Sequence, residues 1–123
     1  MGIREDAVRL HGEGLNCAQC VLCACGKYTG LDKETSVSVA AGFGGGVRCG
    51  EICGAVSGAV MAIGASRKEN TACVAALTKQ CTGAFRERFG NLRCLDLKRA
   101  GVSCDELIAF GAETAEKLIN DKE

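Results

Sequence analysis

Apolar residues recur at helical spacing along most of the chain, and this pattern predicts an all-α fold. Residues 3–14 have the spacing of a first short amphipathic helix. Asn16 is a good N-cap for a second helix that runs from residue 17 to about residue 29, and Gly30 suits its end. Because this second helix is apolar almost all round, we expect it at the centre of the fold.

The middle of the chain combines a third helix with a glycine-rich segment. Asp32 can cap a helix that ends near Ala41, although the alternation over residues 37–39 also suits a strand. Residues 42–46, here called the glycine loop, cannot continue that helix cheaply. A tight turn with close backbone approach explains this loop better than a phosphate site, since it lacks the phosphate-binding motif. A fourth helix should follow from residue 51 or 52 to Gly64.

Small residues and capping signals organise the second half. Three of them recur every four positions in the fourth helix and form a side-chain-poor stripe: Gly54, Gly58 and Ala62. A fifth helix should run from residue 66 or 70 to residue 89, and Ser103 with Glu106 forms a capping box for the last one. We therefore expect residues 1–123 to form a single compact helical domain of about five to seven helices with a Gly-rich loop.

Composition and charge exclude several classes of function. The 15 Lys and Arg residues balance 15 Asp and Glu residues, and aromatic residues are scarce, so nothing favours nucleic-acid binding. The longest apolar run, residues 52–65, is shorter than the roughly 20 residues of a membrane span. Residues 1–11 carry charges instead of a signal-peptide core, so we expect a reducing, cytoplasmic setting. There, ten clustered cysteines favour metal binding or redox chemistry.

Several cysteines fall at predicted helix starts, where free backbone N–H groups favour a thiolate and lower its pKa. Cys17 and Cys20 form a C-x-x-C motif at the start of the second helix, without the βαβ context of thioredoxin. Cys53 is expected in the first turn of the fourth helix. Cys94 follows the fifth helix and Cys104 opens the last one.

The remaining cysteines and the one histidine favour a plainer interpretation. Free cysteine packs well as a small apolar side chain, and four positions are expected to do only that: Cys23, Cys25, Cys73 and Cys81. Cys20 and Cys49 could serve either purpose. His11 is interpreted as a helix-face residue and not as a ligand, because its neighbours lack metal-binding spacing.

From about Asn16 to Leu118 the sequence resembles the C_GCAxxG_C_C family of redox-active proteins. The resemblance is strongest in the glycine loop and in the segment Cys53-Gly54-Ala55-Val56-Ser57-Gly58, which reads C-G-A-x-x-G. It implies a functional set of four cysteines: Cys17, Cys53, Cys94 and Cys104. The chain departs from the family pattern by six further cysteines and by a short spacing between Cys94 and Cys104.

One hypothesis from this resemblance is an iron–sulfur protein for electron transfer or sensing. The four cysteines would hold a [2Fe–2S] cluster, or zinc instead, with Cys49 as a further candidate ligand. Glycines near them would let backbone amides approach the cofactor: Gly44, Gly45, Gly46, Gly54 and Gly58.

A second hypothesis is a metal-free dithiol that cycles to a disulfide. Cys17 would attack, and Cys53 or Cys20 would resolve the mixed disulfide. Either form could serve an oxidoreductase or an electron-transfer accessory protein with a redox partner protein, and a homodimer could shield exposed thiols. The third alternative is a non-catalytic helical interaction module whose cysteines fill the core or hold a structural zinc.

Overall fold

The computed structural model describes residues 2–121, and α-helices account for most of them. The first half contains α1 (Ile3–Gly12), α2 (Cys17–Ala24), α3 (Gly26–Thr29), α4 (Lys33–Ala40) and two irregular turns, η1 (Ala41–Phe43) and η2 (Gly46–Gly50). The second half contains α5 (Gly54–Ser66), the short turn η3 (Thr71–Cys73), α6 (Val74–Phe89), α7 (Cys94–Arg99) and α8 (Cys104–Asn120). Between residues 2 and 121 the only strand-like pairing is an isolated bridge, so the predicted all-α class is confirmed.

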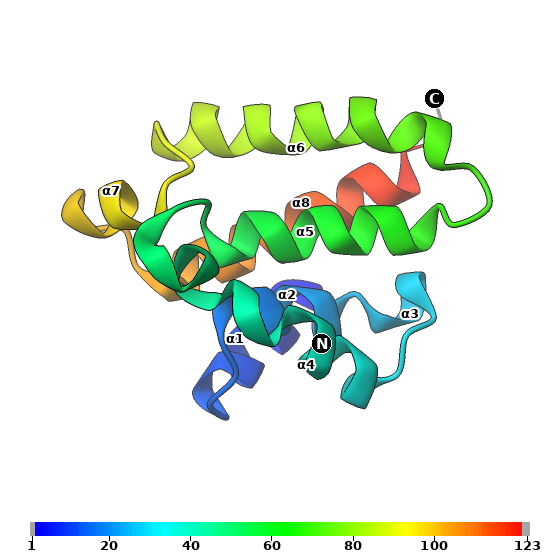
Figure 1. The fold of residues 1–123 in the computed structure, drawn as a ribbon, viewed down its shortest axis with the longest axis horizontal. Helices are drawn as coiled ribbons and strands as arrows, with labels where there is room; N and C mark the ends of the chain where they lie inside the picture. Colours follow the sequence, from blue (N-terminus) through cyan, green and yellow to red (C-terminus); the bar gives the residue numbers. More distant parts are fainter. Residues whose placement is uncertain (1, 122–123) are drawn as a thin grey trace.

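The central helices pack at close range because glycines stand at their crossings. Helix α5 packs between α2 and α8, α1 packs on both α2 and α8, and α6 covers α5 (Figure 1). A Cβ at Gly58 would lie 2.7 Å from the carbonyl oxygen of Ala18 in α2. A Cβ at Gly111 would lie 3.0 Å from that of Ala55, so both crossings depend on glycine.

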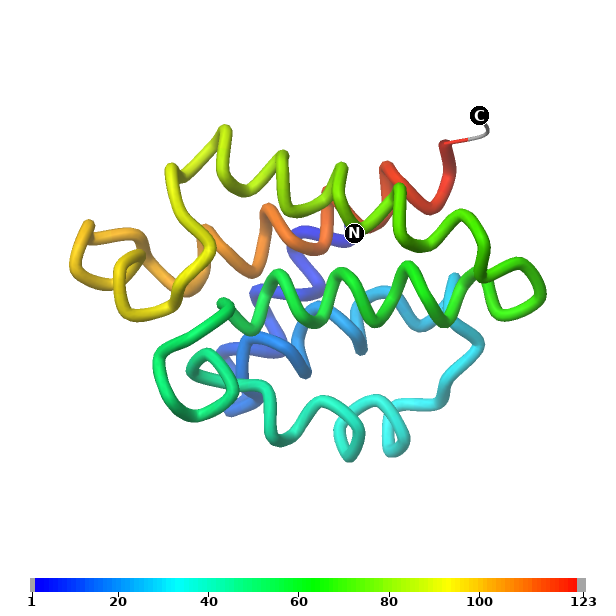
Figure 2. The backbone as a smooth tube through the Cα atoms, turned by 45° about the horizontal axis from the view of Figure 1, so that its top comes forward, coloured from blue at the N-terminus to red at the C-terminus, as the bar shows by residue number. Residues whose placement is uncertain are grey.

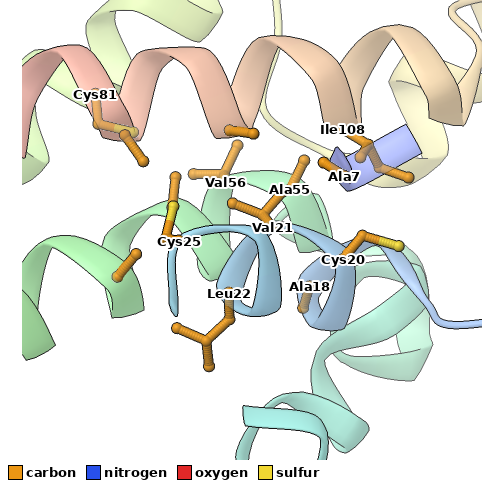
Figure 3. Close-up of a cluster of buried hydrophobic side chains, with 14 of the residues drawn as sticks. Ala7, Ala18, Cys20, Val21, Leu22, Cys25, Ala55, Val56, Cys81 and Ile108 are labelled. Carbon is orange, nitrogen blue, oxygen red and sulfur yellow. The ribbon is translucent and has the colours of Figure 1, made fainter. Parts of the chain in front are cut away.

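The core contains four of the ten cysteines among aliphatic side chains, and one of them is Cys53. Cys20, Cys25 and Cys81 are fully buried and share this cluster with residues such as Val56 and Ile108 (Figure 3). The expectation that Cys25 and Cys81 pack as apolar residues agrees with these positions. No helix within residues 2–121 has both the length and the apolar character that crossing a bilayer requires.

Three helix starts are capped as the sequence predicts. The side chains of Asn16 and Asp32 accept hydrogen bonds from the backbone N–H groups of residues 19 and 35, at 2.9 and 2.7 Å. Ser103 and Glu106 form the predicted capping box at the start of α8. The alternation over residues 37–39 belongs to α4, so the helical interpretation of that segment is correct.

The structure divides the chain more finely than the predicted five to seven helices, into eight within residues 2–121. The predicted second helix ends at Ala24, because Cys25 leaves the helical region with ψ 12° and α3 forms a separate turn. Gly26, which follows Cys25 directly, is the local mark of that break. Helix α7 has six residues, which is too few for a periodic apolar pattern to reveal it.

Two predicted helix starts are wrong by several residues. Helix α5 begins at Gly54 because residues 51–53 pair with residues 92–94 instead. In this pairing Cys53 N–H donates to the carbonyl of Leu92 at 2.8 Å, and Cys94 N–H donates to that of Glu51 at 2.6 Å. Helix α6 begins only at Val74, after η3.

Candidate functional site

The four cysteines singled out by the resemblance lie around one pocket of about 140 Å³. Cys17, Cys94 and Cys104 are the first residues of α2, α7 and α8. Cys53 occupies the N-cap position directly before α5, and not the first turn as predicted. It is 2 % exposed, whereas the other three are half-buried. Four helix starts from distant parts of the chain therefore present one thiol each to the same space.

Local pairing holds these helix starts together. The bridge between Ile52 and Arg93 ties the residue before Cys53 to the residue before Cys94. Figure 2 shows the glycine-loop segment and α7 on the same side of the molecule. At the start of α2, the Asn16 side chain also donates to the carbonyl of Ala41 at 3.1 Å, which links Cys17 to the end of α4.

The glycines predicted to approach a cofactor divide into two groups. Gly45 and Gly54 line the pocket. The other three lie outside its lining and pack against protein atoms: Gly44 against the Asn16 side chain, Gly46 against Glu51 and Cys94, and Gly58 against α2. The close backbone approach that the sequence predicts for this loop is therefore present. Most of these glycines bring the backbone close to other protein atoms and not to the pocket.

The turn η2 continues the glycine loop in a strained conformation. Val47 and Arg48 have φ values of 57° and 62°, in the left-handed region that residues other than glycine rarely adopt. The Arg48 guanidinium donates to the carbonyl of Ala41 at 2.9 Å, which helps to hold this conformation. Such strain costs of order 1–3 kcal/mol per residue and clusters at functional sites in proteins.

The electrostatics of Cys17 contradict the expectation of a low thiol pKa. Burial raises the pKa of Cys17 well above its usual value, and the neighbouring thiols Cys104 and Cys53 raise it further. Desolvation and like charges therefore outweigh the N-terminus of α2, and Cys17 is a protonated thiol at neutral pH.

The pKa of Cys53 is also set by burial and by the nearby helix start, which act in opposite directions. Burial raises its pKa, and the nearby thiols of Cys94 and Cys104 contribute to the rise. Hydrogen bonds from the backbone N–H groups of Ala55 and Val56, in the first turn of α5, lower the pKa and offset part of it. The helix start thus acts as predicted on Cys53, but burial is the larger effect.

Cys20 and Cys49, the two cysteines left open by the sequence, both lie outside the pocket lining. Cys20 is fully buried, its thiol donates to the carbonyl of Leu15 at 3.6 Å, and burial is the main cause that raises its pKa to about 12. Cys49 is exposed on η2 and its thiol donates to the carbonyl of Gly46 at 3.5 Å.

Sequence reasoning passed over two polar residues of the pocket, His11 and Lys98. His11 comes from the last turn of α1, and its Nδ1 lies 2.7 Å from Oδ1 of Asp105. The prediction that His11 is a helix-face residue describes its place on α1 correctly. It did not indicate that this face of α1 lines the pocket. The contact joins residues 94 positions apart, so no local motif could have indicated it.

The fit of a metal centre can be judged from the donor set and its arrangement. Four thiols are suitable ligands in kind for zinc or an iron–sulfur cluster. Within residues 2–121, however, no three His, Cys, Asp or Glu side chains are placed so that they could hold a metal ion. The residues as arranged therefore do not fit a single metal ion.

Comparisons with known proteins place the chain in a family. Neither the curated proteins nor the solved structures searched gave a significant match. A family model described as "Putative redox-active protein (C_GCAxxG_C_C)" matches residues 15–118, a segment that includes all four pocket cysteines. This match covers most of the sequence, and the chain therefore belongs to the C_GCAxxG_C_C family of redox-active proteins.

Proposed function

We propose that the pocket is a dithiol–disulfide redox centre in which Cys17 and Cys104 form the disulfide. The observation that carries this proposal is the meeting of four helix-start cysteines in one pocket, where Cys104 is the neighbouring thiol that raises the pKa of Cys17 most. Both thiols line the same pocket of about 140 Å³, and a disulfide between them requires their Cβ atoms to come within about 3.5–4.5 Å of each other. A single metal ion is not part of the proposal, because the arrangement between residues 2 and 121 offers no group of three ligands for one ion.

Oxidation of this pair removes two protons and two electrons and creates one S–S bond. The thiolate of one pocket cysteine attacks a sulfur of an oxidised partner disulfide, and the second partner sulfur leaves as a thiolate. The other pocket cysteine then attacks the mixed disulfide and releases the partner in its dithiol form. The electrons pass from the pocket to the partner, and the reverse sequence reduces the pocket again.

Cys104 is the better attacking residue of the two. The raised pKa of Cys17 leaves little thiolate at neutral pH, which makes it a slow nucleophile. Cys104 opens the long helix α8, whose N-terminus favours a negative charge. This order reverses the sequence-based assignment of Cys17 as the attacking cysteine and gives it the resolving role.

Thiol counting on the full-length reduced protein tests the proposal. The protein is purified without oxygen, equilibrated in glutathione buffers of increasing potential, alkylated and mapped by mass spectrometry. We expect the free-thiol count to fall by two in one step, with a peptide that links Cys17 to Cys104. Cys17→Ser and Cys104→Ser should each abolish the step, and Cys81→Ala, in the core, should keep it.

Two outcomes would contradict the proposal. Stoichiometric iron or zinc in the anaerobically purified protein, with the four pocket thiols protected from alkylation, would identify a metal centre. A thiol count that never falls by pairs would instead favour cysteines that only pack the fold.

A further inference from the structure

A histidine in the wall of the cysteine pocket is paired with an aspartate outside that wall. His11 lines this pocket together with Cys17 and Cys104. Its partner Asp105 follows Cys104 directly in the first turn of α8, so one helix start carries both the cysteine and the residue that holds the histidine. The side chains of His11 and Asp105 are 35 % and 59 % exposed, so the pair connects the pocket with solvent.

The hydrogen bond fixes which ring nitrogen can accept a proton. An ionised carboxylate only accepts hydrogen bonds, so Nδ1 of His11 carries a proton and donates it to Asp105. In the neutral ring the lone pair then lies on Nε2. No other hydrogen bond to this ring is found in the part of the chain that the structure describes, so Nε2 is free to accept.

The proposed oxidation needs a proton acceptor, and few groups in the pocket can supply one. The attacking thiol must lose its proton before its sulfur becomes nucleophilic. The ammonium group of Lys98, which also lines the pocket, donates only. The other titratable side chains in the lining are the four thiols, and Asp105 is engaged with His11. Imidazole changes charge in the range where thiol exchange is measured, which suits this task.

We infer that Nε2 of His11 accepts the proton of the Cys104 thiol as that sulfur attacks the partner disulfide, and that Asp105 orients the ring for this step. The inference rests on the proposed function and adds a residue to it. In the step, the S–H bond of Cys104 breaks and an N–H bond forms on Nε2. The resulting imidazolium is stabilised by Asp105 and returns its proton to water at the exposed side. His11 lies outside the matched residues 15–118, so the assignment does not come from the family match.

The test measures the rate of Cys17–Cys104 disulfide formation in the full-length reduced protein. The oxidant is excess bis(2-hydroxyethyl) disulfide, and the pH range is 6–10. We expect His11→Gln to react about tenfold more slowly at pH 7, which is less than the roughly 10²–10⁴-fold typical of general base catalysis because water reaches the ring. The difference should fade toward pH 10, where hydroxide removes the proton. Asp105→Ala should give a smaller loss of the same shape.

Rescue and a matched control separate proton transfer from a structural effect. Added imidazole should restore a large part of the rate in His11→Ala and leave the wild-type rate unchanged. Arg9→Gln is the control, because Arg9 is on the same helix, pairs with Asp6 and Glu13, and does not line the pocket. Circular dichroism shows which variants fold, and His11→Asn replaces His11→Gln if the latter does not.

The possible results are distinguishable. A His11→Gln rate equal to wild type at pH 7, or one lowered equally at every pH, overturns the inference alone. Absence of the Cys17–Cys104 disulfide in the wild-type protein overturns the proposed function and the inference with it. A rate loss confined to low pH, with rescue by imidazole, supports the role of His11.

Discussion

The cysteine pocket and the apolar core lie side by side on the same helices, and both contain buried thiols. In the core, Cys25 and Cys81 lie at the end of α2 and in the middle of α6. Around the pocket, each cysteine stands at the very start of its helix. Both regions contain buried cysteines, so burial alone does not decide which region a cysteine joins. Cys73 is also an N-cap, before α6, and lies outside the pocket lining, so the pocket cysteines are set apart because their four helix starts meet.

The two regions also differ in what raises the pKa of their thiols. In the core, burial is the leading cause for Cys25 and the one cause for Cys81. In the pocket, burial raises the pKa of Cys17 together with three neighbouring thiols, those of Cys104, Cys53 and Cys20. Disulfide formation removes this crowding of thiols in the pocket, whereas the core thiols have no such partner to relieve them.

The largest expected effect is a loss of stability at alkaline pH, to which the core thiols contribute. The folded-state pKa values of Cys25 and Cys81, about 12 and about 11, exceed the ordinary value of 9.0. Above pH 9 the unfolded chain therefore holds fewer protons, and stability falls as pH rises. We expect each thiol to lower the free energy of unfolding by about 1.4 kcal/mol per pH unit up to its folded pKa. Urea denaturation of the reduced protein from pH 8 to 11 measures this slope.

Cys25→Ala and Cys81→Ala provide the comparison for this slope. Each should unfold more easily at pH 8, because the core loses a side chain, and each should lose less stability between pH 9 and 11. Equal slopes in the variants and the wild type would mean that these thiols do not carry the alkaline sensitivity.

The next largest expected effect is a loss of stability when the glycine at the α2–α5 crossing is replaced. Gly58→Ala places a Cβ 2.7 Å from the carbonyl of Ala18, so α2 and α5 must separate, and we expect a loss of about 2 kcal/mol. Gly64→Ala is the matched control in the same helix, where the added Cβ meets nothing within 4 Å. The control should stabilise the protein by up to about 1 kcal/mol. Thermal and urea unfolding compare the two, and equal effects would argue against a tight α2–α5 crossing.

The smallest expected effect comes from removing a helix N-cap, either next to the pocket or far from it. Ser103→Ala removes the N-cap of α8 beside Cys104, and Asp32→Ala removes that of α4, away from the pocket. Each should cost about 1 kcal/mol in urea unfolding. Only Ser103→Ala should also change the rate at which glutathione disulfide oxidises the pocket, because it loosens the helix start that holds Cys104. Equal oxidation rates in both variants would mean that the Ser103 cap does not affect the reactivity of the pocket.

Local signals in the sequence account for much of the fold. The caps at Asn16, Asp32 and Ser103 depend on residues within three positions, and all three are present in the structure. The start of α5 could not be found in this way. It is displaced to Gly54 by pairing with residues some forty positions later, and no local pattern contains that contact.

The candidate site divides along the same line. The family resemblance singled out the four pocket cysteines, because their motifs are local in sequence. The thiol pKa values and the place of His11 depend on which helices meet. Burial reversed the expected effect of the helix start on Cys17. The packing of α1 against α8 placed His11 beside Asp105.

The pairing of residues 51–53 with residues 92–94 has a consequence for how this protein tolerates change. Cys53 and Cys94 lie next to each other at the pocket, and the chain between them forms α5 and α6. Helix α5 leads away from the pocket and α6 leads back to it. The turn between α5 and α6, near residues 67–70, is thus a distal end whose length is uncoupled from the pocket. Extra residues inserted there would lengthen the excursion and leave the four sulfur-bearing helix starts where they are.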